Sequence, residues 1–146
     1  MIALGCDSAG FALMKEIKAH LSRKGLEFKD FGTYNEDSVD YPLYAEKVAQ
    51  SVLSGEATKG ILICGTGIGI SIAANRFKGI RCALVHDTFS AKSTRDHNDS
   101  NIIALGARVI GAGLALEIID TWLTTPFSNE ERHARRIALI DSQVQD

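Results

Sequence analysis

The chain has 146 residues, of which 45% are hydrophobic and 23% charged, as expected for one compact domain, residues 1–146, with a sizeable core. Its formal net charge is −2, so no strong positive field is present to attract nucleic acid or an anionic membrane surface. The sequence lacks signal-peptide features and an apolar run of the roughly 18 residues that span a bilayer, so we expect a cytoplasmic protein without membrane or nucleic-acid partners.

Short apolar runs alternate with longer amphipathic segments, a pattern that predicts a parallel sheet covered by helices. Strands are predicted over residues 2–6, 27–31, 60–64, 81–85 and 102–105. Helices are predicted over about residues 11–24, 41–54, 69–76, 88–95, 111–124 and 129–144. Gly25 is expected to end the first helix, and Pro42 falls in the first turn of the second, where proline is tolerated. The fold class is therefore α/β with a five-stranded parallel sheet.

Ligands of an open α/β sheet bind beyond the carboxyl ends of its strands, so the residues that follow each strand are candidates for a site. They include Asp7, Ser8, Cys64, the loop Gly65-Thr66-Gly67-Ile68-Gly69, and Arg108. The fourth helix is followed by His97 and Asn98, and the last helix carries Arg132 and Arg136 one turn apart. We expect all of these groups to converge on one edge of the sheet.

The loop after Cys64 joins a strand end to a helix start, where inward-turned N–H groups bind an oxyanion or a phosphate. The same position favours the thiolate form of Cys64. Cys6 and Cys82 lie in apolar runs and are interpreted as inert thiols, and three unpaired cysteines fit a reducing compartment. A buried structural Cys64 beside a packing loop remains an alternative from these residues alone.

Other glycine-loop chemistries do not fit the sequence. A Walker loop would need a Lys-Ser or Lys-Thr pair after a suitable glycine run, and a dinucleotide fingerprint would usually follow the first strand. A cysteine phosphatase loop would need arginine at position 70, which is Ile70. The four histidines show no metal-ligand spacing, so we predict neither a metal nor a cofactor. The arginine pair, taken alone, is equally compatible with a solvated basic helix face.

Five motifs occur in an order that resembles the ribose-5-phosphate isomerase B family, which includes allose- and galactose-phosphate isomerases. The motifs are GCDSAGF at residues 5–11, DYP at 40–42, ICGTGIGISIAAN at 63–75, RDHNDSN at 95–101, and the Arg132/Arg136 pair. The resemblance covers the whole chain. It implies a Rossmann-like three-layer α/β/α domain without cofactor, which forms homodimers or homotetramers whose active sites are shared between subunits.

The resemblance also implies roles for individual residues. Cys64 would be the base that moves a proton between C2 and C1 of the open-chain sugar, through a cis-enediolate. Thr66 and the Gly65 to Gly69 amides would stabilise the oxyanion, and His97 would open the sugar ring. Asp7 would bind a sugar hydroxyl, Asn98 would position the substrate, and Tyr41 would cover the thiol. The phosphate would be bound by Arg108, Arg132 and Arg136.

One residue departs from the family pattern, because Ser8 stands where the family usually has histidine. The shorter side chain is expected to weaken phosphate binding or to change the choice of sugar. The leading interpretation is interconversion of ribose 5-phosphate and ribulose 5-phosphate. The alternatives are isomerisation of a six-carbon sugar phosphate, such as allose 6-phosphate or galactose 6-phosphate, and a non-catalytic sugar-phosphate-binding domain.

The helix predicted over residues 111–124 provides a separate expectation about assembly. It is apolar around most of its circumference, which is unusual for a helix with one side in water. We therefore expect a partner subunit to cover it.

Overall fold

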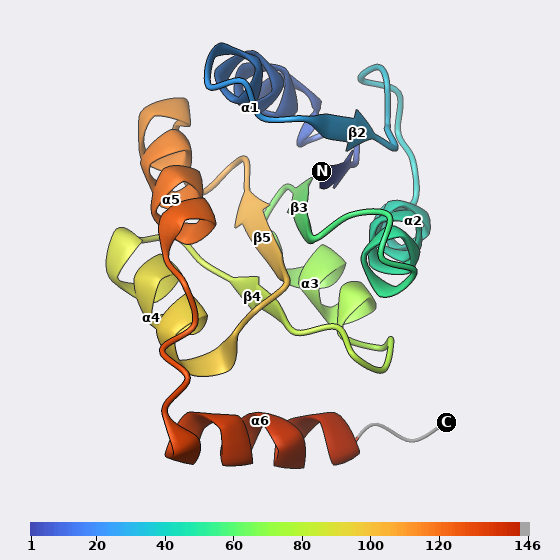
Figure 1. Ribbon diagram of the computed structural model, residues 1–146. Coiled ribbons are helices and arrows are strands. Elements are labelled where there is room, and N and C mark those ends of the chain that lie inside the picture. Colours follow the sequence, from blue (N-terminus) through green and yellow to red (C-terminus); the bar gives the residue numbers. More distant parts are fainter. Residues whose placement is uncertain (144–146) are drawn as a thin grey trace.

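The computed structural model describes residues 1–143 and shows a parallel sheet with helices on both faces (Figure 1). Its strands are β1 (Ile2–Cys6), β2 (Phe28–Asp30), β3 (Lys59–Cys64), β4 (Cys82–Leu84) and β5 (Ile102–Gly106). Its helices are α1 (Phe11–Arg23), α2 (Tyr41–Leu53), α3 (Ile68–Ala74), α4 (Thr88–Asn98), α5 (Ala112–Thr124) and α6 (Glu131–Ser142). Within the described residues, no helix combines the length and apolar character needed to cross a membrane.

The five strands pair in the order β2-β1-β3-β5-β4, and every pairing is parallel. The chain leaves β1 toward β2 on one side and continues to β3 on the other. The strand order therefore reverses between β1 and β3, which is where ligands bind in doubly wound sheets. The expected α/β/α architecture with a five-stranded parallel sheet is confirmed.

Alternate residues of the central strands pack into two separate cores. Leu4, Ile61 and Ile103 belong to the core beneath α1, α4 and α5, whereas Leu62 and Ala104 belong to the core beneath α2 and α3. Because both faces of the sheet are covered, β1, β3 and β5 contain almost no polar residue. This burial explains why these strands appear in the sequence as continuous apolar runs.

Most predicted boundaries agree with the structure to within two residues, and α4 is the main exception. This helix was expected to end at position 95 but continues to Asn98, and Asp99 follows it in the left-handed region at φ 44°. Arg95, buried beneath the last turn, donates to the Ser100 carbonyl oxygen at 2.7 Å. The predicted end of the last helix, at position 144, lies outside the described residues.

The expectation that a partner must cover α5 is not supported by the packing. Ala115, Ile118, Ile119 and Trp122 are buried within the chain, in the core that α1 and α4 complete. The Trp122 indole N–H donates to the Ser100 hydroxyl at 2.9 Å. Much of the apolar surface of α5 is therefore buried within the chain, whereas Leu114 remains exposed.

Candidate active site

The first group of candidate residues surrounds the thiol of Cys64 at the carboxyl end of β3. Cys64 is 4% exposed and pairs in the sheet with Gly106 of β5. Its Sγ atom accepts a hydrogen bond from the backbone N–H of Gly67 at 3.2 Å. The Thr66 hydroxyl accepts from the Ile68 N–H at 3.2 Å, which closes the loop into the start of α3. The loop thus holds the sulfur against a backbone donor.

Close packing fixes the glycine loop from two sides. A Cβ at Gly106 would lie 2.6 Å from the Thr66 carbonyl oxygen, so the end of β5 packs directly against the loop. A Cβ at Gly69 would lie 2.5 Å from the Tyr41 hydroxyl, so the Tyr41 ring lies against the opposite side. Both contacts require the absence of a side chain. The expected placement of Tyr41 over the thiol loop agrees with this geometry.

Gly67 is the loop position at which we expect alanine to be most damaging. Its φ is +77°, and an added Cβ would lie 2.6 Å from the Leu84 side chain and 2.8 Å from the Leu105 backbone carbon. Gly67→Ala should therefore lower the free energy of unfolding by about 1–3 kcal/mol, measured by urea denaturation. Gly113→Ala on α5 is the matched control, because its Cβ would meet nothing within 4 Å. Equal stability of Gly67→Ala and the wild type would contradict this expectation.

Asp7, Ser8 and Arg108 lie in the loops that flank the Cys64 loop. The Asp7 carboxylate accepts from the Gly10 N–H at 3.1 Å, which fixes the turn after β1. The Arg108 backbone N–H donates to the Gly65 carbonyl oxygen at 3.0 Å, and a Cβ at Gly65 would lie 3.5 Å from the guanidinium. Asp7, Ser8, Tyr41, the 64–69 loop and Arg108 therefore form one cluster, which we call the thiol half-site.

His97 and Asn98 lie elsewhere, at the opposite end of the sheet. They occupy the last turn of α4, which runs back from the carboxyl edge to the amino edge. Three residues later, the Asn101 carbonyl oxygen accepts from the N–H of Gly60, at the beginning of β3. Both side chains are exposed. The sequence placed these residues correctly near a helix end but on the wrong edge of the sheet.

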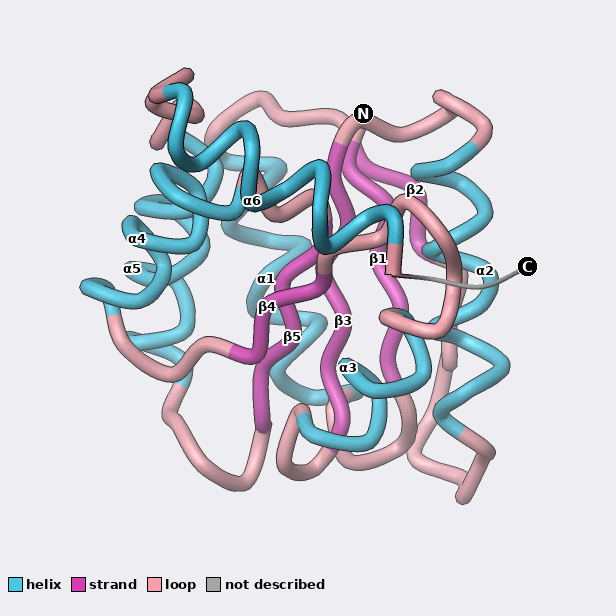
Figure 2. Tube along the Cα trace, turned by 90° about the horizontal axis from the view of Figure 1, so that it is seen from below, coloured by secondary structure: helices cyan, strands magenta, loops and turns pink. Residues whose placement is uncertain are grey.

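Helix α6 brings the two remaining arginines to this same amino edge. Figures 1 and 2 show α6 crossing the end of the sheet, apart from the helices on its faces. The His133 ring stacks on the His97 ring with centroids 4.4 Å apart and an interplanar angle of 21°. Arg132 and Arg136 are both exposed. His97, Asn98, Arg132 and Arg136 form a second cluster, which we call the imidazole half-site.

The environment of His133 disfavours protonation of its ring. Loss of solvent contact lowers the pKa of His133, and so do His97, Arg132 and Arg136, whereas Glu130 acts in the opposite direction. The His133 Nε2 atom accepts from Arg132 Nε at 3.4 Å, which assigns the ring proton to Nδ1. His133 is therefore a buried support for the exposed ring of His97.

The expected convergence of all site residues on one edge is wrong. Gly60 contacts Asn101, three residues beyond the end of α4, whereas Cys64 carries the thiol. These two residues of β3 lie about 13 Å apart. The error arises because residues at the end of a helix were grouped with residues at the end of a strand. In a βαβ unit those two ends lie on opposite edges of the sheet. One copy of the chain thus presents two separate half-sites.

The other two cysteines behave as the sequence predicts. Burial raises the pKa of the Cys6 thiol to about 12, with Asp30 contributing in the same direction. Burial alone raises the pKa of Cys82 to about 12. Neither thiol is available as a base near neutral pH. Only Cys64 combines a free thiol with a loop of backbone donors at the strand-order reversal.

Two supporting residues were missed as such by the sequence interpretation. His133 is buried and stacked, whereas its place in an Arg-rich helix suggested a surface residue. Arg81 was included in a strand, yet its side chain connects α4 to α6. Periodicity does not reveal such contacts, because they join segments that are distant in the sequence.

Comparison with known proteins agrees with the fold. The ribose/galactose isomerase family matches residues 2–140. The chain is 50% identical to the ribose-5-phosphate isomerase B of Escherichia coli over 139 residues, covering 95% of this chain and 93% of the relative. A solved ribose-5-phosphate isomerase B from Clostridium thermocellum superposes with a TM-score of 0.95 at 50% identity, covering 97% and 95% of the two chains.

A more distant relative is the galactose-6-phosphate isomerase subunit LacB of Clostridium acetobutylicum, which is 37% identical over 146 residues, covering 100% of this chain and 84% of the relative. The family match, the relatives and the fold define a sugar-phosphate isomerase. The chain belongs to the ribose/galactose isomerase family, and its relatives and structural neighbours are of the ribose-5-phosphate isomerase B type. It is therefore an enzyme rather than a non-catalytic binding domain.

Proposed function

We propose that this enzyme interconverts ribose 5-phosphate and ribulose 5-phosphate, with Cys64 as the base. The observation that carries this proposal is the Cys64 thiol, whose sulfur accepts a backbone hydrogen bond at the carboxyl edge of the sheet. The thiolate is the form of a cysteine side chain that abstracts a proton. The names of the relatives support the same substrate.

In the proposed reaction Cys64 takes the C2 proton of the open-chain aldose, and the electrons of that C–H bond form the C1–C2 double bond of a cis-enediolate. Thr66 and the loop amides stabilise the negative oxygen. Removing one such donor typically costs about 3 kcal/mol of transition-state stabilisation. Cys64 then returns the proton to C1, and the proton of the C2 hydroxyl is transferred to the C1 oxygen, so that C2 becomes the ketone and C1 carries the hydroxyl. No net oxidation occurs, and no cofactor is required.

The imidazole half-site supplies the other steps. His97 accepts the proton of the C1 hydroxyl and delivers it to the ring oxygen as the bond between C1 and that oxygen breaks, which opens the furanose ring. Asn98 positions the sugar. Arg132 and Arg136 hold the phosphate together with Arg108, through charge-assisted hydrogen bonds. Arg136 makes no ion pair within residues 1–143, so its guanidinium is available to an anion.

Because one copy separates the half-sites, we propose that a second copy completes each active site as a homodimer, or as a pair of dimers in a homotetramer. Exposed apolar residues adjoin both half-sites. Ile68 and Ile72 lie on α3 beside the thiol loop, and Leu139 and Ile140 lie on α6. Contact between these surfaces would bury apolar area and bring His97 toward Cys64 of the other copy.

We place the reaction in the cytoplasm. All three cysteines are free thiols, and a reducing compartment keeps them so. Thiolate chemistry at Cys64 requires the same conditions, since an oxidised sulfur cannot accept a proton.

A six-carbon substrate is the second candidate, and Ser8 is the residue that favours it. Ser8 is short, lies at the end of β1 within the thiol half-site, and leaves more room than a histidine would. The galactose-6-phosphate isomerase relative shows that its family includes such an activity. The phosphate and the reacting carbons would be held by the same two half-sites.

Substrate comparison tests the proposed reaction. Purified protein is incubated with ribose 5-phosphate, allose 6-phosphate and galactose 6-phosphate, and ketose formation is followed. We expect the highest kcat/KM with ribose 5-phosphate.

Ser8→His should lower the KM for ribose 5-phosphate with little change in kcat, because an added phosphate contact acts on ground and transition states alike. Higher kcat/KM with a hexose phosphate would establish the six-carbon alternative.

A further inference from the structure

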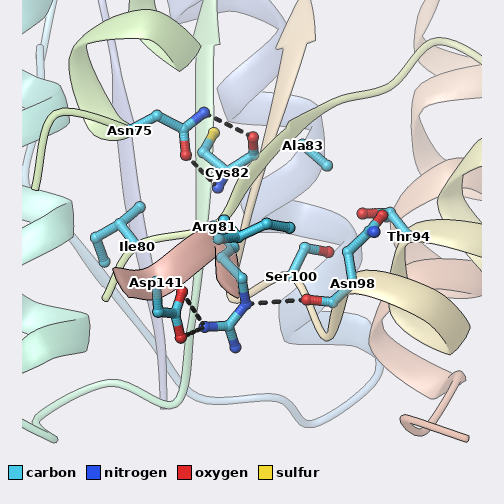
Figure 3. A pocket seen from close by; sticks show the side chains of 10 residues that line it. Asn75, Ile80, Arg81, Cys82, Ala83, Thr94, Asn98, Ser100 and Asp141 are labelled. Atoms are coloured by element: carbon cyan, nitrogen blue, oxygen red, sulfur yellow. Dashed lines mark hydrogen bonds and ion pairs between the residues drawn. The ribbon is translucent and has the colours of Figure 1, made fainter. Parts of the chain in front are cut away.

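Arg81 immediately precedes β4, and its side chain is 17% exposed. It lines a cavity of about 350 Å³ between α6 and the amino edge of the sheet (Figure 3). Asn98 of the imidazole half-site and Asp141 of α6 line the same cavity. The guanidinium thus occupies the space between the two elements that carry the imidazole half-site.

On one side, Arg81 binds the turn that follows α4. Its Nε atom donates to the Asn98 carbonyl oxygen at 2.9 Å, and Nη2 donates to the Asp99 carbonyl oxygen at 3.0 Å. Its backbone N–H donates to the Asn101 side chain at 2.9 Å. These carbonyl groups belong to the end of a helix, where they have no intrahelical partner. Arg81 therefore fixes the backbone of the residues next to His97.

On the other side, Arg81 binds α6. Its Nη1 atom donates to both carboxylate oxygens of Asp141, at 2.9 and 3.2 Å. The side chain of Arg81 is mostly buried, so this pair is less screened by water than a surface pair. Figure 3 shows the guanidinium between Asp141 and Asn98, with hydrogen bonds to each.

Helix α6 has few other attachments. His133 is its only buried residue among the described part of the helix, and it stacks on His97. Asp141 lies eight positions after His133, which corresponds to about 12 Å along a helix axis. Two attachments at that distance fix the direction of α6. With only the His133 contact, α6 would pivot about that point and Arg136 would move.

We propose that Arg81 is a positioning residue that holds α6 against the last turn of α4, so that His97, Asn98, Arg132 and Arg136 form a preassembled half-site. This inference rests on the proposed function for its catalytic consequence. The positioning itself does not depend on which sugar phosphate is the substrate. Preassembly removes the cost of ordering the phosphate-binding arginines at the moment of binding.

The test uses Asp141→Asn, which removes the charge that binds Arg81 while leaving the Arg81 contacts to Asn98 and Asp99 in place. Backbone amides of residues 131–142 should exchange hydrogen faster, while those of β5 remain protected. The KM for ribose 5-phosphate and the dissociation constant of inorganic phosphate should each rise about fivefold. The kcat should change less, because the phosphate is held equally in ground and transition states.

Arg81→Met keeps the apolar stem and removes every guanidinium contact, so kcat should fall as well, through the loosened turn beside His97. Combining it with Asp141→Asn should add nothing further in KM, because both changes break one interaction. Arg135→Met is the matched control. Within residues 1–143, Arg135 pairs only with Glu131 of the same helix, at 3.0 Å, and its loss should leave exchange and kinetics unchanged.

Unchanged exchange of α6 together with an unchanged KM in Asp141→Asn would overturn the role of Arg81. So would a uniform loss of stability with wild-type kinetics, which would indicate a structural contact alone. If the wild-type protein isomerised no sugar phosphate, the proposed function would be wrong. Hydrogen exchange and inorganic phosphate binding would still decide whether Arg81 positions α6.

Discussion

Cys64→Ser is expected to lower kcat for ribose 5-phosphate by about a thousandfold or more while leaving sugar-phosphate binding largely intact. A serine hydroxyl is a far weaker acid than a thiol, so it provides no anionic base near neutral pH. The substitution nearly preserves the shape of the side chain and its hydrogen bond from the Gly67 N–H. Binding depends on arginines that the substitution does not touch.

Turnover is measured by ketose formation, and binding is measured by titration calorimetry with the same sugar phosphate. Cys82→Ser is the matched control, because burial raises the pKa of Cys82 to about 12 and its thiol has no proposed part in the reaction. That variant should keep kcat. Near-normal turnover in Cys64→Ser would remove the base assignment, whereas loss of binding would indicate a damaged loop.

Mixing two inactive variants is expected to restore activity. Cys64→Ser destroys the thiol half-site and His97→Asn destroys the imidazole half-site, each in its own chain. In a mixed dimer, one active site combines the intact half-site of each chain, and the other combines the two damaged ones. Random mixing of equal amounts should therefore restore about a quarter of wild-type activity.

The variants are unfolded together, refolded, and compared with equal amounts refolded separately. Size-exclusion chromatography with light scattering reports the assembly state. Activity that remains at the sum of the separate variants would show that His97 and Cys64 of one chain act together, contrary to the distance along β3. A monomer at micromolar concentration would also contradict the shared site.

The layered fold was predictable from the sequence because its strands are buried on both faces. Runs such as Ile61 to Cys64 alternate with amphipathic helices, and this pattern has few interpretations. Most of the thiol half-site was predictable for the same reason, since all its residues except Tyr41 lie at the ends of strands or in the segments that follow them. Position relative to a strand end is a local property of the sequence.

The imidazole half-site was assigned to the wrong edge of the sheet, because its location depends on the direction in which the helices run. His97 lies two residues beyond the expected end of the helix, and the extra turn that carries it is stabilised by hydrogen bonds from Arg95 to Ser100 and Thr125. The stacking of His133 on His97 joins α6 to α4 through space. The hydrophobic periodicity of the sequence reveals none of these contacts.

The placement of the two half-sites on opposite edges of the sheet affects how the rate depends on protein concentration. On the shared-site proposal, the number of working sites follows the concentration of paired chains rather than the concentration of chains. Above the dissociation constant of the dimer, the rate rises in proportion to total protein. Below it, the rate falls with the square of the concentration, since two chains must meet for each complete site. Dilution alone would then lower the activity per chain, without any bound inhibitor.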